Sequence, residues 1–447
     1  MSKEYDRLDG GSALTHANES TTNAIGSSEG ETTEIELESI YNRQIDSLCL
    51  KLAQNIWIFW NFSGMGEAVG SILELLVGSN YSVLIAGQVN SGKSTLCREL
   101  VNSLLSSDRD GVVFPLVAWI DCDSGQPEFT APCLVSLHLL STAVKGGPLE
   151  HMKQPELQFF IGSSSPREDK EYYIQCIFAL LNRYKELAST LSGPLPLVIN
   201  TNGWVKGAGG VLLGRIAQFA APSLIVQLLN EADHLAGRDL TEFHSWAPSS
   251  GLLSLRASDQ AEAAGKNGLT ARNTRDLMIT KYFQSDQTPL ASAVPYRVPW
   301  TQLRVRFMLH EVPPSMSMYA LNGAVVGLCY DATKYQLAAP KTLEEHRRYP
   351  LFLSSTPICE CVGLGLIRAI DPDQCVYYIV TPLPLEQLAR VNTILKGNVE
   401  LPTTALIDGG VVHAPYLCSN SLTMADHGSG ITPMAKKRPD LPRRRLA

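Results

Sequence analysis

One glycine-rich run in this chain combines a lysine and a hydroxyl group at the spacing that phosphate chemistry requires. Residues 87–94, Gly-Gln-Val-Asn-Ser-Gly-Lys-Ser, match the pattern G-x-x-x-x-G-K-S, which is typical of loops that bind nucleoside triphosphates. In such a loop the backbone N–H groups and the positive end of the next helix face the phosphate oxygens. Lys93 is expected to neutralise the β- and γ-phosphates, and Ser94 is expected to hold Mg²⁺. The residues predicted to bind ATP are Gly87, Asn90, Ser91, Gly92, Lys93, Ser94 and Thr95.

The segments on either side of this loop favour a ligand site over a plain glycine-rich turn, which is the alternative interpretation. Residues 81–86 form a short apolar run that predicts a buried strand. Residues 95–105 predict a helix, with apolar residues at 96, 100, 101, 104 and 105. A strand, a phosphate loop and a helix in this order form the context in which the motif binds nucleotide.

Two acidic residues follow the second predicted strand. Residues 116–120 are apolar, and Asp121 and Asp123 come directly after them, on the same side of an extended chain. Ligands of open α/β sheets bind beyond the carboxyl ends of the strands, where a carboxylate can hold Mg²⁺ or accept a proton from an attacking hydroxyl. Both aspartates are predicted to be catalytic and, with Ser94, to bind the metal, and Asp123 is the first candidate for the base. Capping of the following turn is the alternative for either one.

Short apolar strands alternate with helical stretches from residue 81 to about residue 285. The later strands are predicted at 195–200 and 223–229. This alternation predicts an α/β fold of the phosphate-loop nucleotide-hydrolase type, a mostly parallel sheet with helices on both faces. Residues 239–270, rich in Ala, Ser, Gly and Asp, predict an insertion. Beyond residue 290, β-branched runs separated by Pro, Gly and Asp predict a smaller, mostly β domain.

The ends of the chain differ from its middle in charge and composition. Residues 1–46 carry three basic and ten acidic side chains, whereas the last twelve residues carry six basic side chains and one acidic one. Polar, charged segments cannot bury enough apolar surface to offset their ordering entropy. The predicted division is a disordered acidic arm at 1–46, a short region at 47–80 that packs on the nucleotide-binding domain at 81–289, the β domain at 290–420, and a disordered basic tail at 421–447.

Composition excludes several classes of protein. No run of 18 uncharged apolar residues predicts a membrane span, and no membrane partner is expected. The ten cysteines are scattered and include no C-x-x-C pair, which favours buried thiols over a zinc site.

The stretch Asp121-x-Asp123-x-Gly125-Gln126-Pro127-Glu128-Phe129 resembles the signature of eukaryotic polynucleotide 5′-hydroxyl kinases, in the branch involved in ribosomal RNA processing. The likeness covers about residues 80–400, with Pro132-Cys133 standing where the family usually has Pro-Gly. The further matching motifs are Phe160-Ile161-Gly162, Ser165-Pro166, Asn200-Thr201-Asn202-Gly203-Trp204, Pro295-Tyr296-Arg297-Val298-Pro299-Trp300, Ala320-Leu321-Asn322, Gly363-Leu364-Gly365 and Thr381-Pro382-Leu383-Pro384.

The resemblance implies a kinase that uses ATP and Mg²⁺ to phosphorylate the 5′-hydroxyl ends of RNA. It further implies a role in pre-ribosomal RNA maturation in the nucleus and nucleolus, beside an endonuclease that leaves a 5′-hydroxyl end. The basic residues at 436–438 and 443–445 fit a nuclear address, and a solubilising tail is the alternative. Two other interpretations are a kinase of the tRNA-splicing and mRNA 3′-end branch, and an ATP-bound scaffold without catalysis.

The acceptor is expected to meet residues that follow the strand at 195–200. The indole of Trp204 offers a flat face on which a terminal base can stack, and Gly203 lets the backbone turn so that the ring projects. In the family this tryptophan clamps the terminal base; a tryptophan buried under residues 207–210 is the alternative. The residues predicted to bind the acceptor are Gln126, Thr201, Gly203 and Trp204.

A helical segment at 271–283 resembles the lid of the family. Arg272 and Arg275 are three positions apart and share one helix face. Either can stabilise the charge on the transferred phosphoryl group, and both are predicted to be catalytic. A solvated basic face that pairs with nearby acids, such as Asp276, is the alternative.

Overall fold

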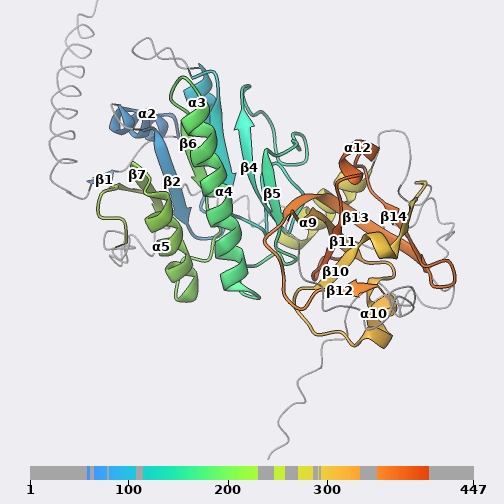
Figure 1. Ribbon diagram of the computed structural model, residues 1–447. Coiled ribbons are helices and arrows are strands. Elements are labelled where there is room, and N and C mark those ends of the chain that lie inside the picture. Colours follow the sequence, from blue (N-terminus) through green and yellow to red (C-terminus); the bar gives the residue numbers. More distant parts are fainter. Residues whose placement is uncertain are drawn as a thin grey trace, which may run out of the picture. The chain divides into compact units, whose positions relative to one another are not determined.

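The structure is a computed structural model that contains two β-sheets with their helices (Figure 1). The predicted disordered arm at 1–46 and tail at 421–447 lie outside the described residues. The described residues are 58–60, 65–77, 80–106, 114–229, 246–256, 270–284, 290, 293–332 and 350–401.

The first sheet has eight strands in the order β1-β8-β7-β2-β6-β3-β4-β5. All neighbours are parallel except β4, which runs antiparallel to both β3 and β5. This arrangement confirms the predicted mostly parallel sheet. Its strands are β1 (Ile58–Trp60), β2 (Ser82–Gly87), β3 (Val117–Asp121), β4 (Leu134–Leu140), β5 (Leu157–Phe160), β6 (Leu197–Asn200), β7 (Leu224–Leu229) and β8 (Gly251–Arg256).

Alternation along the strands explains why helices cover both faces of this sheet. In β2, Val83 and Ile85 share a core cluster with α2 (Met65–Leu76) and α3 (Lys93–Ser106). The alternate residues Leu84 and Ala86 belong to a second cluster with two further helices, α4 (Lys170–Thr190) and α5 (Ala208–Ala220). Successive side chains of a strand point to opposite faces, so a strand that is apolar throughout requires a helix layer on each side.

Chain order reverses on either side of β2, which pairs with β6 on one edge and with β7 on the other. Ligand crevices of open α/β sheets form at such a reversal, beyond the carboxyl ends of the strands. Four loops begin at these ends, after β2, β3, β5 and β6. The topology therefore collects the phosphate loop and the segments after residues 121, 160 and 200 at one edge.

The second sheet has seven strands in the order β12-β10-β15-β11-β13-β14-β9, as the β-branched texture of this region predicted. One face carries its own core cluster, which includes residues of α10 (Pro314–Leu321). A short helix, α12 (Leu385–Leu388), follows β14. The strands are β9 (Tyr296–Pro299), β10 (Arg304–Phe307), β11 (Val325–Tyr330), β12 (Leu351–Phe352), β13 (Glu360–Asp371), β14 (Val376–Val380) and β15 (Thr393–Lys396).

The helix α9 (Ala271–Phe283) joins the second sheet to the site edge of the first. Its carboxyl-terminal half is buried through Met278, Ile279 and Phe283, and the backbone N–H of Leu364 in β13 donates to the Tyr282 hydroxyl at 2.8 Å. Because this half is fixed by burial, the first turns of α9 extend toward the phosphate loop from a rigid base.

A close backbone contact fixes the loop after β5 against the end of β15. The backbone N–H of Asn398 donates to the Gly162 carbonyl at 2.7 Å. A Cβ atom on Gly397 would lie 2.1 Å from the same carbonyl oxygen, so only glycine fits there. The second sheet thereby supports the loop that carries residues 163–167.

Some elements differ from the sequence predictions. Strand β8 lies within the segment 239–270, which was predicted to be an insertion. The strand was not recognised in the sequence because its apolar run is short and set among Ser, Ala and Gly. Strands β4 and β5 were not predicted. In β4 the buried polar residues Ser136 and His138 interrupt the apolar pattern and contact each other at 3.0 Å between Oγ and Nε2.

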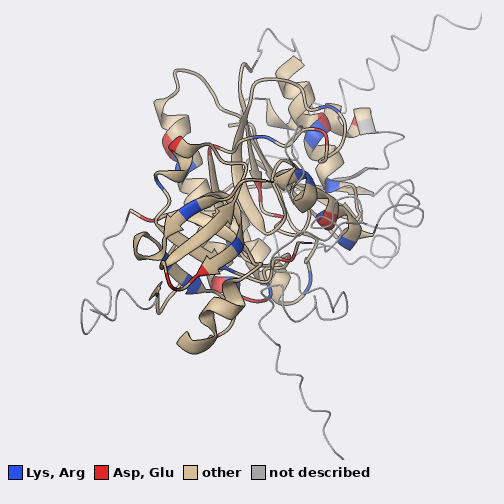
Figure 2. Ribbon diagram, turned by 90° about the vertical axis from the view of Figure 1, so that its right-hand side faces the viewer, with Lys and Arg blue, Asp and Glu red and all other residues tan. Residues whose placement is uncertain are grey.

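Basic and acidic positions are interspersed along the described elements (Figure 2). Within those elements, no helix has both the length and the apolar character needed to cross a membrane.

Cys133, which stands where the family usually has glycine, adopts a left-handed backbone with φ of 70°. It is buried, its N–H donates to the Ser124 carbonyl, and its carbonyl accepts from Ile161 N–H, each at 2.8 Å. Left-handed backbone costs a non-glycine residue roughly 1–2 kcal/mol.

We therefore expect Cys133→Gly to unfold at a higher urea concentration than Cys133→Ala. Both variants lose the thiol, but only glycine relieves the backbone strain, so the difference in unfolding free energy should be about 1 kcal/mol in favour of glycine. Equilibrium unfolding of the two variants measures this directly. An alanine variant as stable as the glycine variant, or more stable, would contradict the strain.

Candidate active site

A cavity of about 470 Å³ lies at the edge of the first sheet where the four loops meet. It brings together residues that are far apart in the sequence: the phosphate loop, the turn after β3, the loop after β5, the loop after β6 and the start of α9. Its lining residues are Val89, Asn90, Ser91, Gly92, Lys93, Ser94, Thr95, Asp123, Gly125, Gln126, Ser164, Ser165, Pro166, Arg167, Asn202, Gly203, Trp204, Ala271 and Arg275.

The phosphate loop has the backbone conformation that its sequence predicts. Asn90 and Gly92 have φ values of 61° and 90°, and α3 begins at Lys93. The Lys93 ammonium is buried and donates to the Gln88 carbonyl at 2.6 Å, across the loop. Burial lowers the pKa of Lys93, and the nearby carboxylate of Asp123 opposes that shift. The loop thus encloses a cation that is hydrogen-bonded to a neutral carbonyl and lies near the Asp123 carboxylate.

Asp123 presents a carboxylate to the cavity. Its Oδ1 accepts from the backbone N–H groups of Gly125 and Gln126, at 2.9 and 3.2 Å, which fixes the side chain. Its Oδ2 accepts no hydrogen bond from the described residues. Burial raises the pKa of Asp123, while the charges of Lys93 and Arg275 oppose the rise. A fixed carboxylate with a raised pKa is a suitable proton acceptor.

Asp121 lies behind the cavity, fully buried, and is not among the lining residues. Its Oδ1 accepts from Asp123 N–H at 3.0 Å and from Asn200 Nδ2 at 3.2 Å, and its Oδ2 accepts from Glu128 N–H at 2.7 Å. Burial raises the pKa of Asp121 to about 8. Asn200 Nδ2 also donates to Ser94 Oγ at 3.4 Å. In this placement Asp121 positions the turn at 123–128 and, through Asn200, the Ser94 hydroxyl, and it does not line the cavity.

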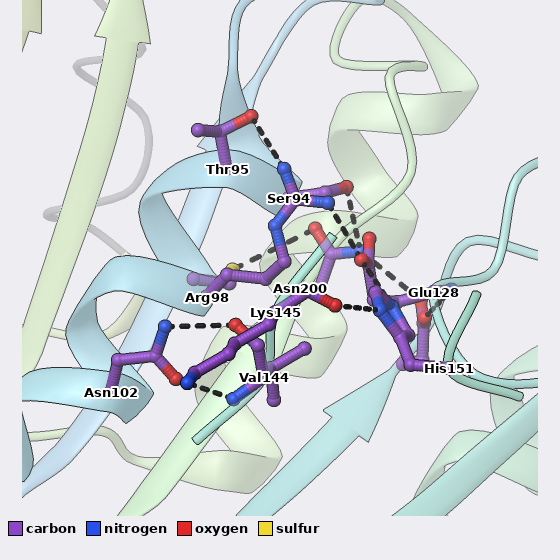
Figure 3. A network of polar contacts seen from close by, with 11 residues as sticks. Ser94, Thr95, Arg98, Asn102, Glu128, Val144, Lys145, His151 and Asn200 are labelled. Carbon is purple, nitrogen blue, oxygen red and sulfur yellow. Dashed lines mark hydrogen bonds and ion pairs between the residues drawn. The ribbon is translucent and has the colours of Figure 1, made fainter. Parts of the chain in front are cut away.

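A buried ion pair ties the turn after β3 to α3 (Figure 3). Arg98 Nη1 donates to Glu128 Oε1 at 2.8 Å, and His151 Nε2 lies 2.9 Å from the same oxygen. The Glu128 side chain is only 2% exposed, and a buried carboxylate of this kind needs its partners. The network therefore holds residues 121–128 against the helix that begins at Lys93.

Trp204 also lines the cavity, and its backbone is held by hydrogen bonds. Its N–H donates to Asn202 Oδ1 at 2.9 Å, and Asn202 Nδ2 donates to the Tyr173 hydroxyl at 3.0 Å. That hydroxyl donates in turn to the Cys122 carbonyl at 2.7 Å. The loop of Trp204 is thereby linked to the residue between the two aspartates.

Glycine permits close approach between two pairs of loops. A Cβ atom on Gly203 would lie 2.7 Å from the Val89 nitrogen of the phosphate loop. A Cβ atom on Gly125 would lie 2.8 Å from the Ser164 carbonyl oxygen. A side chain at either position would force the loops apart and widen the cavity.

The two lid arginines have different positions. Thr270 caps α9 by accepting from Asn273 N–H at 3.2 Å. Arg275 lines the cavity, and its charge acts on the carboxyl group of Asp123, whereas Arg272 is exposed and outside the lining. Because an α-helix has 3.6 residues per turn, two side chains three positions apart point in similar but not identical directions. The structure thus brings Arg275, and not Arg272, to the site.

The residues predicted to bind the acceptor also separate. Gln126, Gly203 and Trp204 line the cavity. Thr201 is buried and its hydroxyl donates to the Ile85 carbonyl at 2.7 Å, which ties β6 to β2. Thr201 therefore supports the loop instead of contacting a ligand.

Some site residues were missed by sequence reasoning. Arg167 and Asn202 line the cavity, as does Ser164. A signal was present, since Ser165-Pro166 and Asn200–Trp204 were recognised as motifs, but their spacing did not reveal which side chains face the ligand.

The residues present fit a nucleoside triphosphate with Mg²⁺. The Ser91 hydroxyl is buried and makes no hydrogen bond within the described part of the chain. It can therefore donate a hydrogen bond to a phosphate oxygen of a bound nucleotide. The cations Lys93 and Arg275 complement phosphate charge. Ser94 and Asp123 are the oxygen donors available for Mg²⁺, which prefers hydroxyl, carboxylate and phosphate oxygens.

Two protein families match consecutive parts of the chain. The family described as "mRNA cleavage and polyadenylation factor CLP1 P-loop" matches residues 87–285. The family described as the NOL9-like C-terminal domain matches residues 291–402. The first match covers the loops of the cavity together with α9, and the second covers the seven-stranded sheet.

Whole-chain relatives agree with these matches. The polynucleotide 5′-hydroxyl-kinase NOL9 of Danio rerio is 30% identical over 79% of this chain and 52% of its own length. The human NOL9 protein is 29% identical over 76% of this chain and 52% of its own length. The chain thus spans about half the length of these two relatives. The NOL9 protein of Arabidopsis thaliana is 30% identical over 76% of this chain and 90% of its own length.

Solved structures support the fold. A wild-type Clp1p–Pcf11p complex contains a chain with a TM-score of 0.54 and 17% identity, covering 75% of this chain and 78% of that one. Taken with the cavity and its residues, the sequence relationships are decisive: this chain belongs to the polynucleotide 5′-hydroxyl-kinase family of the NOL9 and GRC3 type.

Proposed function

We propose that this protein transfers the γ-phosphoryl group of ATP to the 5′-hydroxyl end of a polynucleotide. The observation that carries the proposal is a single cavity lined by the phosphate loop, Asp123, Arg275 and Trp204. A protein that only bound ATP would need the phosphate loop but no carboxylate and aromatic ring facing it. The family relationship supports the same chemistry, because the relatives are named as polynucleotide 5′-hydroxyl kinases.

In this proposal the residues of the chain divide the work. The loop amides and Lys93 bind the phosphates, and Arg275 stabilises the charge that spreads over the transferred group. Asp123 accepts the proton of the 5′-hydroxyl, using the oxygen that the backbone leaves free. Trp204 stacks on the terminal base and so holds the hydroxyl in position. Mg²⁺, bound near Ser94 and Asp123, supplies further neutralisation of phosphate charge.

We further propose that the acceptor is RNA with a 5′-hydroxyl end and that the pathway is pre-ribosomal RNA processing. The support is the match of residues 291–402 to the NOL9-like C-terminal domain, which favours this branch over the tRNA-splicing and mRNA 3′-end branch. A nucleolar location and an endonuclease partner that leaves such ends belong to the same proposal. The basic residues at 436–438 and 443–445 support a nuclear address.

The assay that tests this function follows label from γ-labelled ATP to a short 5′-hydroxyl RNA in the presence of Mg²⁺. We expect transfer by the wild type and a loss of about 10²–10⁴-fold in kcat for Asp123→Asn, because the proton acceptor is removed. Lys93→Ala should lose about 10²-fold or more, since a charge on the phosphates is lost. The matched control is Asp373→Asn, an exposed aspartate in the β13–β14 turn, which should keep full activity.

The result that would contradict the function is the absence of label on RNA despite tight binding of ATP by the wild type. That outcome would favour the ATP-bound scaffold. Label on a 3′-hydroxyl or on protein, with none on the 5′ end, would contradict it as well.

Truncation of the indole separates acceptor binding from nucleotide binding. We expect Trp204→Ala to raise KM for the RNA by roughly 5–100-fold, because base–aromatic stacking contributes about 1–3 kcal/mol. KM for ATP should stay within about twofold, and Trp204→Phe should retain most of the acceptor affinity, because a ring remains. Steady-state kinetics with each substrate varied in turn measures both. An unchanged KM for RNA in Trp204→Ala would exclude the stacking role.

A further inference from the structure

The guanidinium of Arg167 covers the ring of Trp204. Its central carbon lies 4.8 Å from the ring centroid, and both residues line the cavity. Arg167 belongs to the loop between β5 and α4, whereas Trp204 follows β6. A side chain from a different loop therefore occupies the surface that the proposed acceptor base requires.

The guanidinium of Arg167 is held by its contact with this ring. The backbone of Arg167 is fixed, because its N–H donates to Ser165 Oγ and its carbonyl accepts from Lys170 Nζ, both at 3.4 Å. The residue is exposed, and its guanidinium forms no hydrogen bond or ion pair within the described part of the chain. An exposed cation on an aromatic ring is weakly bound, so this side chain is free to change rotamer.

The indole packs closely against the first turn of α5. A Cβ atom on Gly209 in the first turn of that helix would lie 2.4 Å from Trp204 Cγ. A base that stacks on the ring face covered by the guanidinium has to take its place. Base stacking on an aromatic side chain is stronger than an exposed cation–π contact, so the exchange is favourable.

The other two cations of the cavity are engaged at its reacting end. The charges of Lys93 and Arg275 both act on the Asp123 carboxyl group, which places them around the proton acceptor. Arg167 instead lies over the Trp204 ring. The positive charge of Arg167 thus lies in the part of the cavity where the acceptor is proposed to bind.

We propose that Arg167 determines specificity by binding the phosphate that links the first and second nucleosides of the acceptor, after the terminal base has displaced it from Trp204. This inference rests on the proposed kinase function. The planar guanidinium offers two parallel N–H donors that match a phosphate, and the phosphate is joined through one sugar to the base that displaces it. The exchange makes the site select a polynucleotide over a free nucleoside.

A charge-removal cycle tests the proposal. Short 5′-hydroxyl RNA acceptors, 2′-deoxy at the first two nucleotides, carry a neutral methylphosphonate at the first linkage, at the second linkage or at neither. For the wild type, neutralising the first linkage should lower kcat/KM by about 10–100-fold, the loss of a charged hydrogen-bonded contact. For Arg167→Ala the same change should cost less than about threefold, because the partner is already absent.

Two controls keep a structural effect apart from the proposed contact. Arg215→Ala removes a half-buried arginine beside an aromatic ring, 5.9 Å from the Phe178 centroid, paired with Glu171 at 2.8 Å and outside the cavity, and should behave as the wild type. Arg167→Lys keeps the charge but not the paired donors, and its loss should lie between those of the wild type and Arg167→Ala. Neutralising the second linkage should affect wild type and Arg167→Ala equally.

Equal losses from the first-linkage change in the wild type and in Arg167→Ala would overturn the proposal, even if both transfer label. The same comparisons are repeated by measuring the Kd of fluorescently labelled acceptors by anisotropy, which does not depend on turnover. If the wild type transfers no label to unmodified RNA, the kinase function fails. The binding cycle still decides whether Arg167 contacts that phosphate.

Discussion

The buried carboxyl group of Asp121 holds the site together. It accepts hydrogen bonds from the backbone of its own turn, through Asp123 and Glu128, and from the Asn200 side chain at the end of β6. Asn200 reaches Ser94 at the start of α3. Removal of the carboxyl group would take this acceptor from the buried N–H groups of Asp123 and Glu128, and a buried donor left unsatisfied costs about 1–3 kcal/mol. This group therefore connects the turn after β3 with the end of β6 and, through Asn200, with the start of α3.

The same interaction explains why two aspartates only two residues apart have different surroundings. The sequence predicts both on one side of an extended chain, but β3 ends at Asp121 and the chain turns immediately afterwards. Asp121 therefore points into the protein, and Asp123 belongs to a turn that lines the cavity. Strand periodicity cannot locate the residue at which a strand ends, since that depends on hydrogen bonds from Asn200 and Glu128 that no local pattern reveals.

The sequence pattern predicted those parts of the fold that depend on neighbouring residues in the chain. The phosphate loop, the central strands and the mostly β second sheet follow from apolar periodicity and glycine spacing. The strand β4 was missed because it contains the buried polar pair Ser136 and His138, and β8 was missed because its apolar run is interrupted by Ser254 and set among Ser, Ala and Gly. Within the site, Lys93, Asp123 and Trp204 were predicted to act on ligands and do line the cavity. Roles that depend on long-range packing, such as the choice between Arg272 and Arg275, required the structure.

The second sheet contributes to the site through rigid attachment. It holds α9 through Tyr282 and the loop after β5 through Gly162 and Gly397. The side chains that close two walls of the cavity, Arg275 and Arg167, are carried by these two segments. Changes in the second sheet are therefore expected to reach the site through these attachments.

The central claim is that donor and acceptor meet in one cavity. Its most direct test is the affinity of a single molecule in which adenosine is joined through four phosphates to the 5′ oxygen of a short RNA. The account predicts binding at least about 100-fold tighter than that of ATP or of the RNA alone, because one pocket holds both parts without a second association cost. It also predicts that Lys93→Ala and Trp204→Ala each remove most of this gain. An affinity no better than that of ATP, unaffected by Trp204→Ala, would contradict it.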